Sequence, residues 1–507
     1  MRNNTHTNKK INKNNISRKK TRGGKAIDAG SYGCVFKPAL KCDDNSKIPY
    51  NENNISKLMF KKDGESEIKE IKKIEQYIKN IPNNEKYFLV ANTYTCNPAP
   101  ITQKEDLKTF DEKCGLFTKR DIDSYNVNEN LNKLELINMP NGGLSIERFV
   151  LRLLEMPDKY ITFIKLNNAL IQLLINGIVP INKLGVNHFD VKSANILFSP
   201  DGNARLIDWG LAGNNDGVTI PDEIKDRSFA FNMPFSDVLF NSYIKKWLPD
   251  EFNKIKASRN FRDSKDGQKE LLKVIAVNLI NKSIQETSDG HYDYITSNIL
   301  HDIYKIYADR NSYNRLDYNV LTYNVLIEYI QAVLMNFVDE NGNFDSIKYF
   351  YEVFSPNADV WGFILTYAPF IEDGYGKLHK DIINGICRIL LKYCFSPEYA
   401  IKVIDINDLV ADLTSLNDIA QNLPHSNMPT MGKRVAANMR AANNNNNERP
   451  AIAMPLKTKA YNNVDANLFP LKTKAKLRTK QLIPDKSDIL TRNIKQNILD
   501  FPSDLDI

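Results

Sequence analysis

The chain has 507 residues, of which 42% are hydrophobic, and carries a formal net charge of +7. A chain of this length holds about three domains on average. We see no secretion signal and no apolar run long enough to span a membrane. The cysteines form no C-x-x-C pair, which argues for a reducing compartment and against a disulfide scaffold or a zinc site; they are Cys34, Cys42, Cys96, Cys114, Cys387 and Cys394.

The positive charge lies at the two ends of the chain. Residues 1–25 contain nine Lys or Arg and no acid, and residues 432–507 contain fourteen Lys or Arg against seven acids. Subtracting these two excesses from +7 leaves −9 for the rest. Both ends lack apolar periodicity, so we expect disordered, basic, low-complexity tails at 1–25 and 421–507. Such tails act as plain linkers or, as the second interpretation, make weak contacts with nucleic acid or an acidic surface.

Two glycines near the N-terminus predict a hairpin. Residues 27–36 read Ile-Asp-Ala-Gly-Ser-Tyr-Gly-Cys-Val-Phe, with Gly30 and Gly33 three positions apart. Glycine tolerates positive φ and lets backbone N–H groups approach a phosphate closely. The segment is therefore either a plain turn or a loop that covers phosphates. Asp28 places a negative charge there, which a phosphate would avoid.

A short apolar strand and an amphipathic helix follow. Residues 54–60 read as a strand that contains Lys57, and the next segment has isoleucines at helical spacing. Glu67 and Glu70 lie on the first part of this helix. Either could pair with Lys57, or each could pair with a neighbouring lysine on the helix surface.

The middle of the chain predicts a strand, a turn and two helices. Residues 134–143 alternate apolar and polar side chains and end in Asn-Gly-Gly, which is typical of a half-buried strand that leads into a turn. A helix is expected from Ser145 to Leu154. A second one should precede residue 188, because a thick apolar face is formed by Leu166, Leu170, Ile171, Leu173, Leu174 and Ile178.

The most informative stretch reads His-Phe-Asp-Val-Lys-Ser-Ala-Asn-Ile-Leu at 188–197 and Leu-Ile-Asp-Trp-Gly at 206–210. A loop, a short hairpin and a second loop can bring Asp190, Asn195 and Asp208 into one cleft. Asp190 can accept a proton from a hydroxyl group, and the oxygens of Asn195 and Asp208 suit Mg²⁺. Asp, Asn and Gly also favour ordinary turns, so the other patterns along the chain decide between the two interpretations.

Two further segments complete the pattern. Residues 244–350 predict helices, and we read this region as a helical insertion that packs against the rest or serves as a docking surface. Residues 355–363, Ser-Pro-Asn-Ala-Asp-Val-Trp-Gly-Phe, predict the start of a helix with Asp359 in its first turn.

Together these motifs resemble the eukaryotic-type serine/threonine protein kinase family, whose catalytic loop reads H-R-D-x-x-x-x-N and whose metal loop reads D-F-G. The resemblance covers about residues 26–243 and 350–420. It implies an α+β, two-lobed protein-kinase-like fold over 26–420: a small antiparallel β lobe with one helix at 26–138, a hinge at 138–143, and a large, mostly helical lobe at 144–420 that contains the helical insertion at about 244–350.

The resemblance also implies roles for individual residues, with ATP and Mg²⁺ as cofactors. Asp190 would be the catalytic base and Lys192 would steady the γ-phosphate. Asn195 and Asp208 would hold the metal, whereas His188 and Asp359 would support the catalytic loop. Glu67, or alternatively Glu70, would pair with the ATP-binding lysine. The implied ATP-binding residues are Ile27, Gly30, Ser31, Gly33, Val35, Lys57, Asn138 and Pro140.

The chain departs from the family pattern at several positions. Asp28 replaces a glycine of the phosphate-covering loop. Pro140 lacks the backbone N–H that usually binds adenine, which removes a hydrogen bond worth about 0.5–1.5 kcal/mol. Phe189 replaces the arginine that receives a phosphorylated activation loop, so such activation should be weak. No Glu follows Met233-Pro234, where the family places an ion-paired one.

The predicted activity is ATP-dependent phosphorylation of Ser or Thr on protein substrates. One alternative is a small-molecule phosphotransferase of the aminoglycoside or choline type. The other is a non-catalytic pseudokinase scaffold, which the departures would favour. The heavy use of Asn, Lys, Ile and Tyr suggests an A/T-rich genome, and the chain also resembles kinase-like proteins of large nucleocytoplasmic DNA viruses. That resemblance implies an intracellular location, in the host cytoplasm or the virion.

Overall fold

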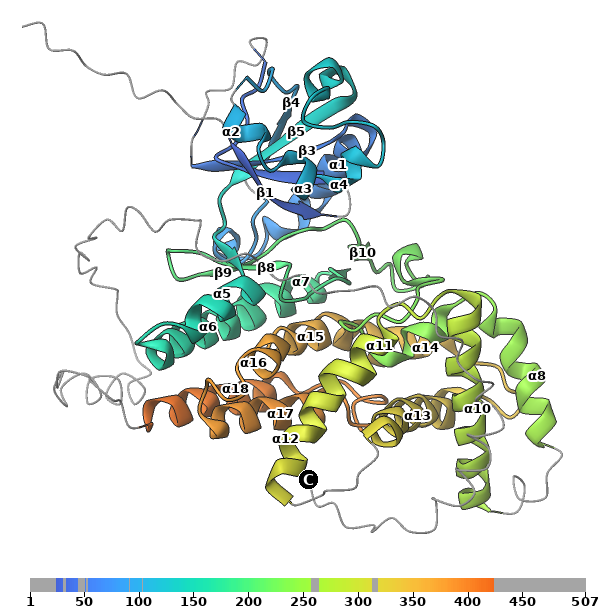
Figure 1. The fold of residues 1–507 in the computed structure, drawn as a ribbon. Coiled ribbons are helices and arrows are strands. Elements are labelled where there is room, and N and C mark those ends of the chain that lie inside the picture. The colour runs from blue at the N-terminus through green and yellow to red at the C-terminus, as the bar shows by residue number, and fades with distance from the viewer. Residues whose placement is uncertain are drawn as a thin grey trace, which may run out of the picture. The chain divides into compact units, whose positions relative to one another are not determined.

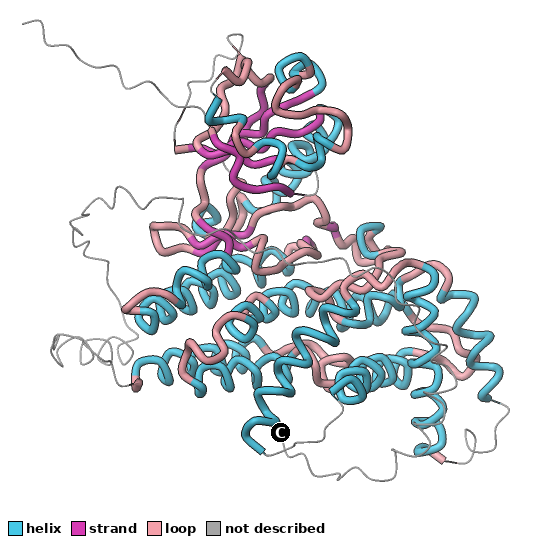
Figure 2. Tube along the Cα trace, in the orientation of Figure 1, coloured by secondary structure: helices cyan, strands magenta, loops and turns pink. Residues whose placement is uncertain are grey.

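A computed structural model describes residues 24–423, apart from 31–32, 44–50, 52, 91, 103, 257–263 and 312–317 (Figure 1). The chain divides into two units, residues 1–425 and 426–507, and all described residues belong to the first. Almost all of the two predicted tails therefore lies outside the described residues. The described part is a mixed α+β fold with a small antiparallel sheet and a mostly helical remainder (Figure 2).

Five antiparallel strands form the main sheet, in the order β1-β2-β3-β5-β4. β1 and β2 make the predicted hairpin, with Gly30 opposite Gly33. β3 and β5 pair along their whole lengths, from Asn54 opposite Pro140 to Phe60 opposite Leu134. The bounds are Lys25–Gly30 for β1, Gly33–Lys37 for β2, Asn54–Phe60 for β3, Tyr94–Cys96 for β4 and Leu134–Pro140 for β5.

Helix α1 (Lys61–Ile78) begins directly after β3. Its isoleucines at 71, 74 and 78 are buried, as the helical spacing predicts, while its Lys and Glu residues mostly face outward. The buried stripe belongs to the same apolar cluster as the helical part of the fold. α1 thus links the strand that carries Lys57 to the main core.

A second apolar cluster covers the sheet on the side of three short helices, α2 (Lys104–Leu107), α3 (Phe110–Lys113) and α4 (Gly115–Thr118). The rings of Phe110 and Phe117 stack at 5.9 Å, and Phe36 of β2 lies 6.3 Å from Phe110. These residues, all buried, form a core separate from the main one.

The cysteine prediction is wrong for four of the six cysteines. Cys34 is disulfide-bonded to Cys114 and Cys42 to Cys96, whereas Cys387 and Cys394 are buried free thiols. Close sequence spacing was the wrong criterion, because the bridges join residues 80 and 54 positions apart that the sheet brings together. The first bridge ties β2 to the α3–α4 turn, and the second ties the chain after β2 to β4.

The helical part begins with α5 (Ile146–Leu154) and α6 (Lys159–Leu173), which continues through a π-helical turn (Leu174–Ile178) into α7 (Val179–Lys183). Short strands around these helices form two small sheets. One has the order β6-β8-β9, and the other pairs β7 with β10. Their bounds are Leu144–Ser145 for β6, Val186–Asn187 for β7, Ile196–Phe198 for β8, Ala204–Leu206 for β9 and Gly213–Asn214 for β10. The last helices are α15 (Ser355–Leu365), α16 (Ala368–Glu372), α17 (Lys380–Tyr393) and α18 (Ile406–Gln421).

The described part of the segment 244–350 is mostly helical, and it shares the main core. Tyr329 of this segment packs edge-on against Trp361 of α15 and against Phe235, which precedes the segment, with ring centroids 5.5 Å apart in both pairs. The segment is therefore built into the helical part. Its helices are α8 (Ile244–Lys256), α10 (Lys265–Glu286), α11 (Tyr292–Tyr294), α12 (His301–Asn311), α13 (Tyr318–Phe337) and α14 (Ser346–Tyr349), with π-helical turns at Ile295–Leu300 and Phe350–Phe354.

One helical run, Lys159–Lys183, is long and apolar enough to cross a membrane. The sequence predicted an apolar helix here, but no run long enough to span a membrane was expected. Its most apolar window is 56% buried inside the protein, and a core helix of a soluble protein meets the same criteria. The run is part of the main core, in which its residues Leu166, Leu170 and Leu173 are almost fully buried.

Candidate active site

Lys57 and Glu67 form an ion pair that joins β3 to α1. The Lys57 Nζ lies 2.6 Å from Glu67 Oε2, and the two side chains are only 12% and 14% exposed. Glu70 instead lies 3.6 Å from Lys73. The choice between the two glutamates is thus settled by geometry in favour of Glu67.

The charge of Asp208, in the loop that follows β9, acts on Glu67 of the same ion pair. Burial raises the pKa of Glu67, the positive charge of Lys57 opposes the rise, and the negative charge of Asp208 adds to it. Asp208 is therefore close enough to act on Glu67 electrostatically. Lys57, Glu67 and Asp208 belong to one polar region built from β3, α1 and the β9 loop.

The glycine hairpin lies next to Lys57. Val35 of β2 is opposite Lys57 of β3, and Ile27 sits in a bulge of β1 between Ala26 and Asp28. A Cβ atom at Gly33 would lie 2.6 Å from the Leu58 carbonyl oxygen. Only glycine therefore fits at this position of β2 without moving the neighbouring strand β3. Ser31 lies outside the described residues, so its predicted role in ATP binding stays a prediction.

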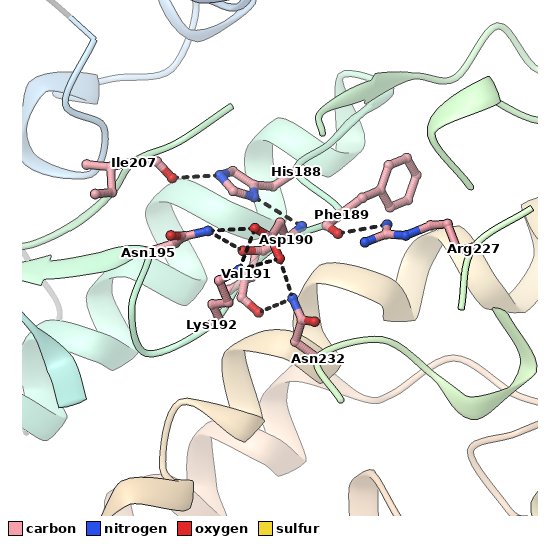
Figure 3. A network of polar contacts seen from close by, with 9 residues as sticks. All are labelled: His188, Phe189, Asp190, Val191, Lys192, Asn195, Ile207, Arg227 and Asn232. Carbon is pink, nitrogen blue, oxygen red and sulfur yellow. Dashed lines mark hydrogen bonds and ion pairs between the residues drawn. The ribbon is translucent and has the colours of Figure 1, made fainter. Parts of the chain in front are cut away.

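Asp190 is the centre of a polar network (Figure 3). Lys192 Nζ lies 3.0 and 2.8 Å from the two carboxylate oxygens. Asn195 Nδ2 donates to Oδ2 at 2.9 Å and to the Asp190 carbonyl at 2.9 Å. Asn232 Nδ2 donates to Oδ1 at 2.9 Å. These donors hold the carboxylate in one orientation.

Asn195 and Asp208 come together at one end of a hairpin. Ile196 of β8 is opposite Leu206 of β9, and the Ile207 amide donates to the Asn195 carbonyl at 2.9 Å. Asp208 follows directly and has a positive φ of 66°. Such a backbone conformation costs a non-glycine residue of order 1–3 kcal/mol and often marks a functional position.

The oxygens of these two residues fit a magnesium ion. Asn195 uses its amide nitrogen toward Asp190, which leaves its side-chain oxygen as an acceptor. Among the described residues, none donates a hydrogen bond to the exposed Asp208 carboxylate. A free carboxylate and a neutral oxygen are the hard ligands that Mg²⁺ takes, with water and phosphate completing its shell.

The loop that carries Asp190 is held in place by α15. The buried Asp359 accepts hydrogen bonds from the His188 and Phe189 amides at 2.7 and 2.8 Å. A Cβ atom at Gly362 would lie 2.3 Å from the Val191 carbonyl oxygen, so α15 approaches the loop too closely for any side chain at that position. The structure brings Asp359 to the backbone that it was predicted to support.

His188 takes a supporting position as well. Its Nε2 lies 2.9 Å from the Ile207 carbonyl, and its Nδ1 accepts from the Asp190 amide at 3.2 Å. The ring is fully buried and lies 4.7 Å from that of Trp209. His188 therefore ties the loop of Asp190 to the loop of Asp208, which fixes the distance between the two acids.

Asn138 and Pro140 lie within β5, so the strand extends into the predicted hinge. Asn138 has Ser56 of β3 on one side and Tyr94 of β4 on the other. Its side chain is 1% exposed, and Nδ2 lies 3.5 and 3.3 Å from the sulfurs of Cys42 and Cys96. The connection without regular structure is therefore confined to residues 141–143. The adenine contacts predicted for Asn138 and Pro140 remain predictions.

The sequence prediction missed two residues that hold the loop of Asp190. Asn232 also donates to the Val191 carbonyl at 3.2 Å, and Arg227 donates to the Phe189 carbonyl at 3.1 Å. Phe189 has a positive φ of 55°, and Arg227 steadies that turn. The only signal in the sequence was the position of Asn232 directly before Met233-Pro234, and an Asn in a loop is common.

A buried acid follows this segment. Asp237 is fully buried in a short 3-10 helix, Phe235–Phe240. Burial raises its pKa to about 8, and the nearby positive charge of Arg227 opposes the rise. No Glu follows Met233-Pro234 in the sequence. In the structure Asp237, three residues after Pro234, is the acid that lies near Arg227.

No protein-family model matches the chain, and no curated protein matches it. Within the described residues there is also no group of three or more His, Cys, Asp or Glu side chains that could hold a metal ion by themselves. A magnesium site at Asn195 and Asp208 would therefore depend on phosphate oxygens and water for most of its ligands.

Proposed function

We propose that the protein is a serine/threonine protein kinase with a two-lobed, kinase-like fold. The observation that carries the proposal is the meeting of two parts of the chain. The buried Lys57–Glu67 pair of the sheet region lies within electrostatic reach of Asp208, and Asp208 shares a hairpin end with Asn195, which hydrogen-bonds Asp190. The amine of Lys57, the carboxylates of Asp190 and Asp208 and the amide of Asn195 suit phosphoryl transfer. This reaction needs positioned groups and neutralisation of the phosphate charge.

Each residue has a chemical task in this proposal. Lys57 would hold the α- and β-phosphates of ATP, with Glu67 fixing its amine. Asn195 and Asp208 would hold Mg²⁺, which when bound neutralises phosphate charge. Asp190 would orient the acceptor hydroxyl and accept its proton as the bond to the γ-phosphorus forms and the bond from that phosphorus to the bridging oxygen breaks, which releases ADP. Lys192, now paired with Asp190, is within reach of the charge that develops on the transferred group.

Protein Ser or Thr is the proposed acceptor because Lys192 stands two residues after Asp190, as in kinases that act on these residues. A small-molecule alcohol is the alternative acceptor. The kinship with proteins of large DNA viruses and the location in the host cytoplasm or virion depend on sequence alone and stay predictions.

The test is phosphoryl transfer from ATP labelled in the γ-phosphate, with Mg²⁺ and a mixed protein substrate. Asp190→Asn should lower the turnover number by at least about 10²-fold, the usual scale for a lost general base. The matched control is Asp222→Asn, which changes an exposed acid paired with Lys225 and should keep full activity. Label on choline or an aminoglycoside, and none on protein, would favour the alternative acceptor. Full activity of Asp190→Asn would refute the proposal.

A further inference from the structure

A cavity of about 750 Å³ lies beside residues 141–143, at the end of the predicted hinge. Its lining includes the end of β2, the chain around Tyr87, the faces of α5 and α6, and the β8–β9 turn. Lys57, Asp190, Asn195 and Asp208 are not among its lining residues. The cavity therefore needs an explanation of its own.

Four basic side chains line this cavity and come from four elements. They are Lys37 of β2, Lys86 of the 3-10 turn Asn84–Lys86, Arg152 of α5 and Lys165 of α6. The lining residues include no Asp or Glu. Within the part of the chain that the structure describes, none of the four forms an ion pair with a carboxylate.

Two of these charges affect each other. Burial, and secondarily the positive charge of Arg152, lowers the pKa of Lys37. Like charges held near each other repel unless an anion lies between them. Four cations brought to one hollow without a compensating acid indicate that an anion completes the arrangement.

The floor of the cavity is apolar and aromatic. Phe149 and Phe198 pack edge-to-face with ring centroids 4.6 Å apart, and Tyr87 and Leu144 also contribute to the lining. Concave sites with an apolar floor and a few convergent polar groups are typical of small-molecule binding. A bare inorganic ion would leave this floor without a partner.

We propose that this cavity binds a small organic anion, with an apolar ring body and two or more phosphate, sulfate or carboxylate groups. The ring would lie on Phe149 and Phe198, and the anionic groups would meet Lys37, Lys86, Arg152 and Lys165. The site is independent of the proposed phosphoryl transfer.

The first experiment measures binding of 1,3,6,8-pyrenetetrasulfonate, a fluorescent ring with four anionic groups, to the full chain by anisotropy at physiological salt. Arg152→Gln with Lys165→Gln should weaken binding at least about tenfold, because the anion loses two charge-assisted contacts. The control is Lys245→Gln with Lys246→Gln, which removes the same charge from exposed positions on α8. Equal affinities of the two double variants would overturn the proposal.

A second measurement locates the probe without any substitution and separates the cavity from the basic ends of the chain. Acetylation of lysines by acetic anhydride is followed by mass spectrometry with and without the tetrasulfonate. Lys37, Lys86 and Lys165 should be protected several-fold, and Lys245 and Lys246 should not. Protection confined to lysines of residues 1–25 and 432–507 would contradict the cavity site. Pyrophosphate used in place of the tetrasulfonate should protect the same lysines only weakly, because it lacks a ring, and equal protection would refute the role of the aromatic floor.

Discussion

At the scale of single residues, the orientation of Asp190 is the feature on which the proposed chemistry depends. Its two carboxylate oxygens receive Lys192, Asn195 and Asn232, and its backbone amide donates to His188. The approach of Asn195 was predicted from the spacing of the loop, and the roles of Lys192 and His188 were predicted through the family resemblance. Asn232 was not, because it approaches from a segment about forty residues later and no local pattern marks such a contact.

We predict that Asn232→Ala lowers the turnover number about tenfold. The substitution removes a hydrogen bond to a charged group, which contributes about 1.5–3 kcal/mol, and frees Asp190 to turn away from the acceptor. The KM for ATP should change little, because Asn232 contacts neither Lys57 nor Asp208. Steady-state kinetics measure both parameters, with Asn336→Ala on the surface of α13 as the control. An unchanged turnover number would show that Asn232 does not position the base.

The buried Asp237 gives a prediction about pH. Its pKa is raised from 3.8 to about 8 in the folded protein, so between these values the folded state keeps a proton that the unfolded chain releases. The free energy of unfolding should therefore fall as pH rises through this window, by up to about 1.4 kcal/mol per pH unit. Asp237→Asn, which stays neutral, should remove this dependence.

Urea unfolding at several pH values within that window measures the slope of the free energy of unfolding. The exposed Asp222 supplies the control, since Asp222→Asn should leave the slope of the parent protein intact. Parallel slopes for the parent and Asp237→Asn would mean that Asp237 is ionised in the folded state.

At the scale of elements, the strands and helices that the sequence predicted are those with local patterns. The glycine hairpin, the strand of Lys57 and the isoleucine stripe of α1 depend on spacing within a few residues. The contacts between elements were harder to predict from the sequence. The order β1-β2-β3-β5-β4 and the bridge from Cys34 to Cys114 join distant segments, and a single sequence records no such proximity.

The disulfide between Cys34 and Cys114 should stabilise the sheet region. It closes a loop with a sequence separation of 80, and bridges of this kind contribute about 2–4 kcal/mol, mainly by restricting the unfolded chain. Cys34→Ser with Cys114→Ser should lower the free energy of unfolding by that amount. Denaturant unfolding with and without dithiothreitol measures the effect, and a variant with all four paired cysteines replaced should not respond to the reductant. Six free thiols in the unreduced, denatured protein would contradict the bridges.

At the scale of the whole molecule, the central claim joins the two parts of the fold. The spacing of Asp190, Asn195 and Asp208 was enough to predict that they meet, because a single short hairpin separates them. The approach of Lys57 and Glu67 to Asp208 was predictable only through the family resemblance, since more than a hundred residues lie between them. The basic cavity was not foreseen, because its four cations come from four separate elements.

The most direct measurement of this claim is Mg²⁺-dependent binding of ATP to the full chain by isothermal titration calorimetry. Lys57→Met and Asp208→Ala should each weaken the affinity at least about tenfold, which corresponds to about 1.4 kcal/mol, and Lys72→Met on the exposed side of α1 should not. ATP that binds without Mg²⁺, or with equal affinity to the parent protein and to both variants, would contradict the proposed clamp of the triphosphate between the sheet and the catalytic loops.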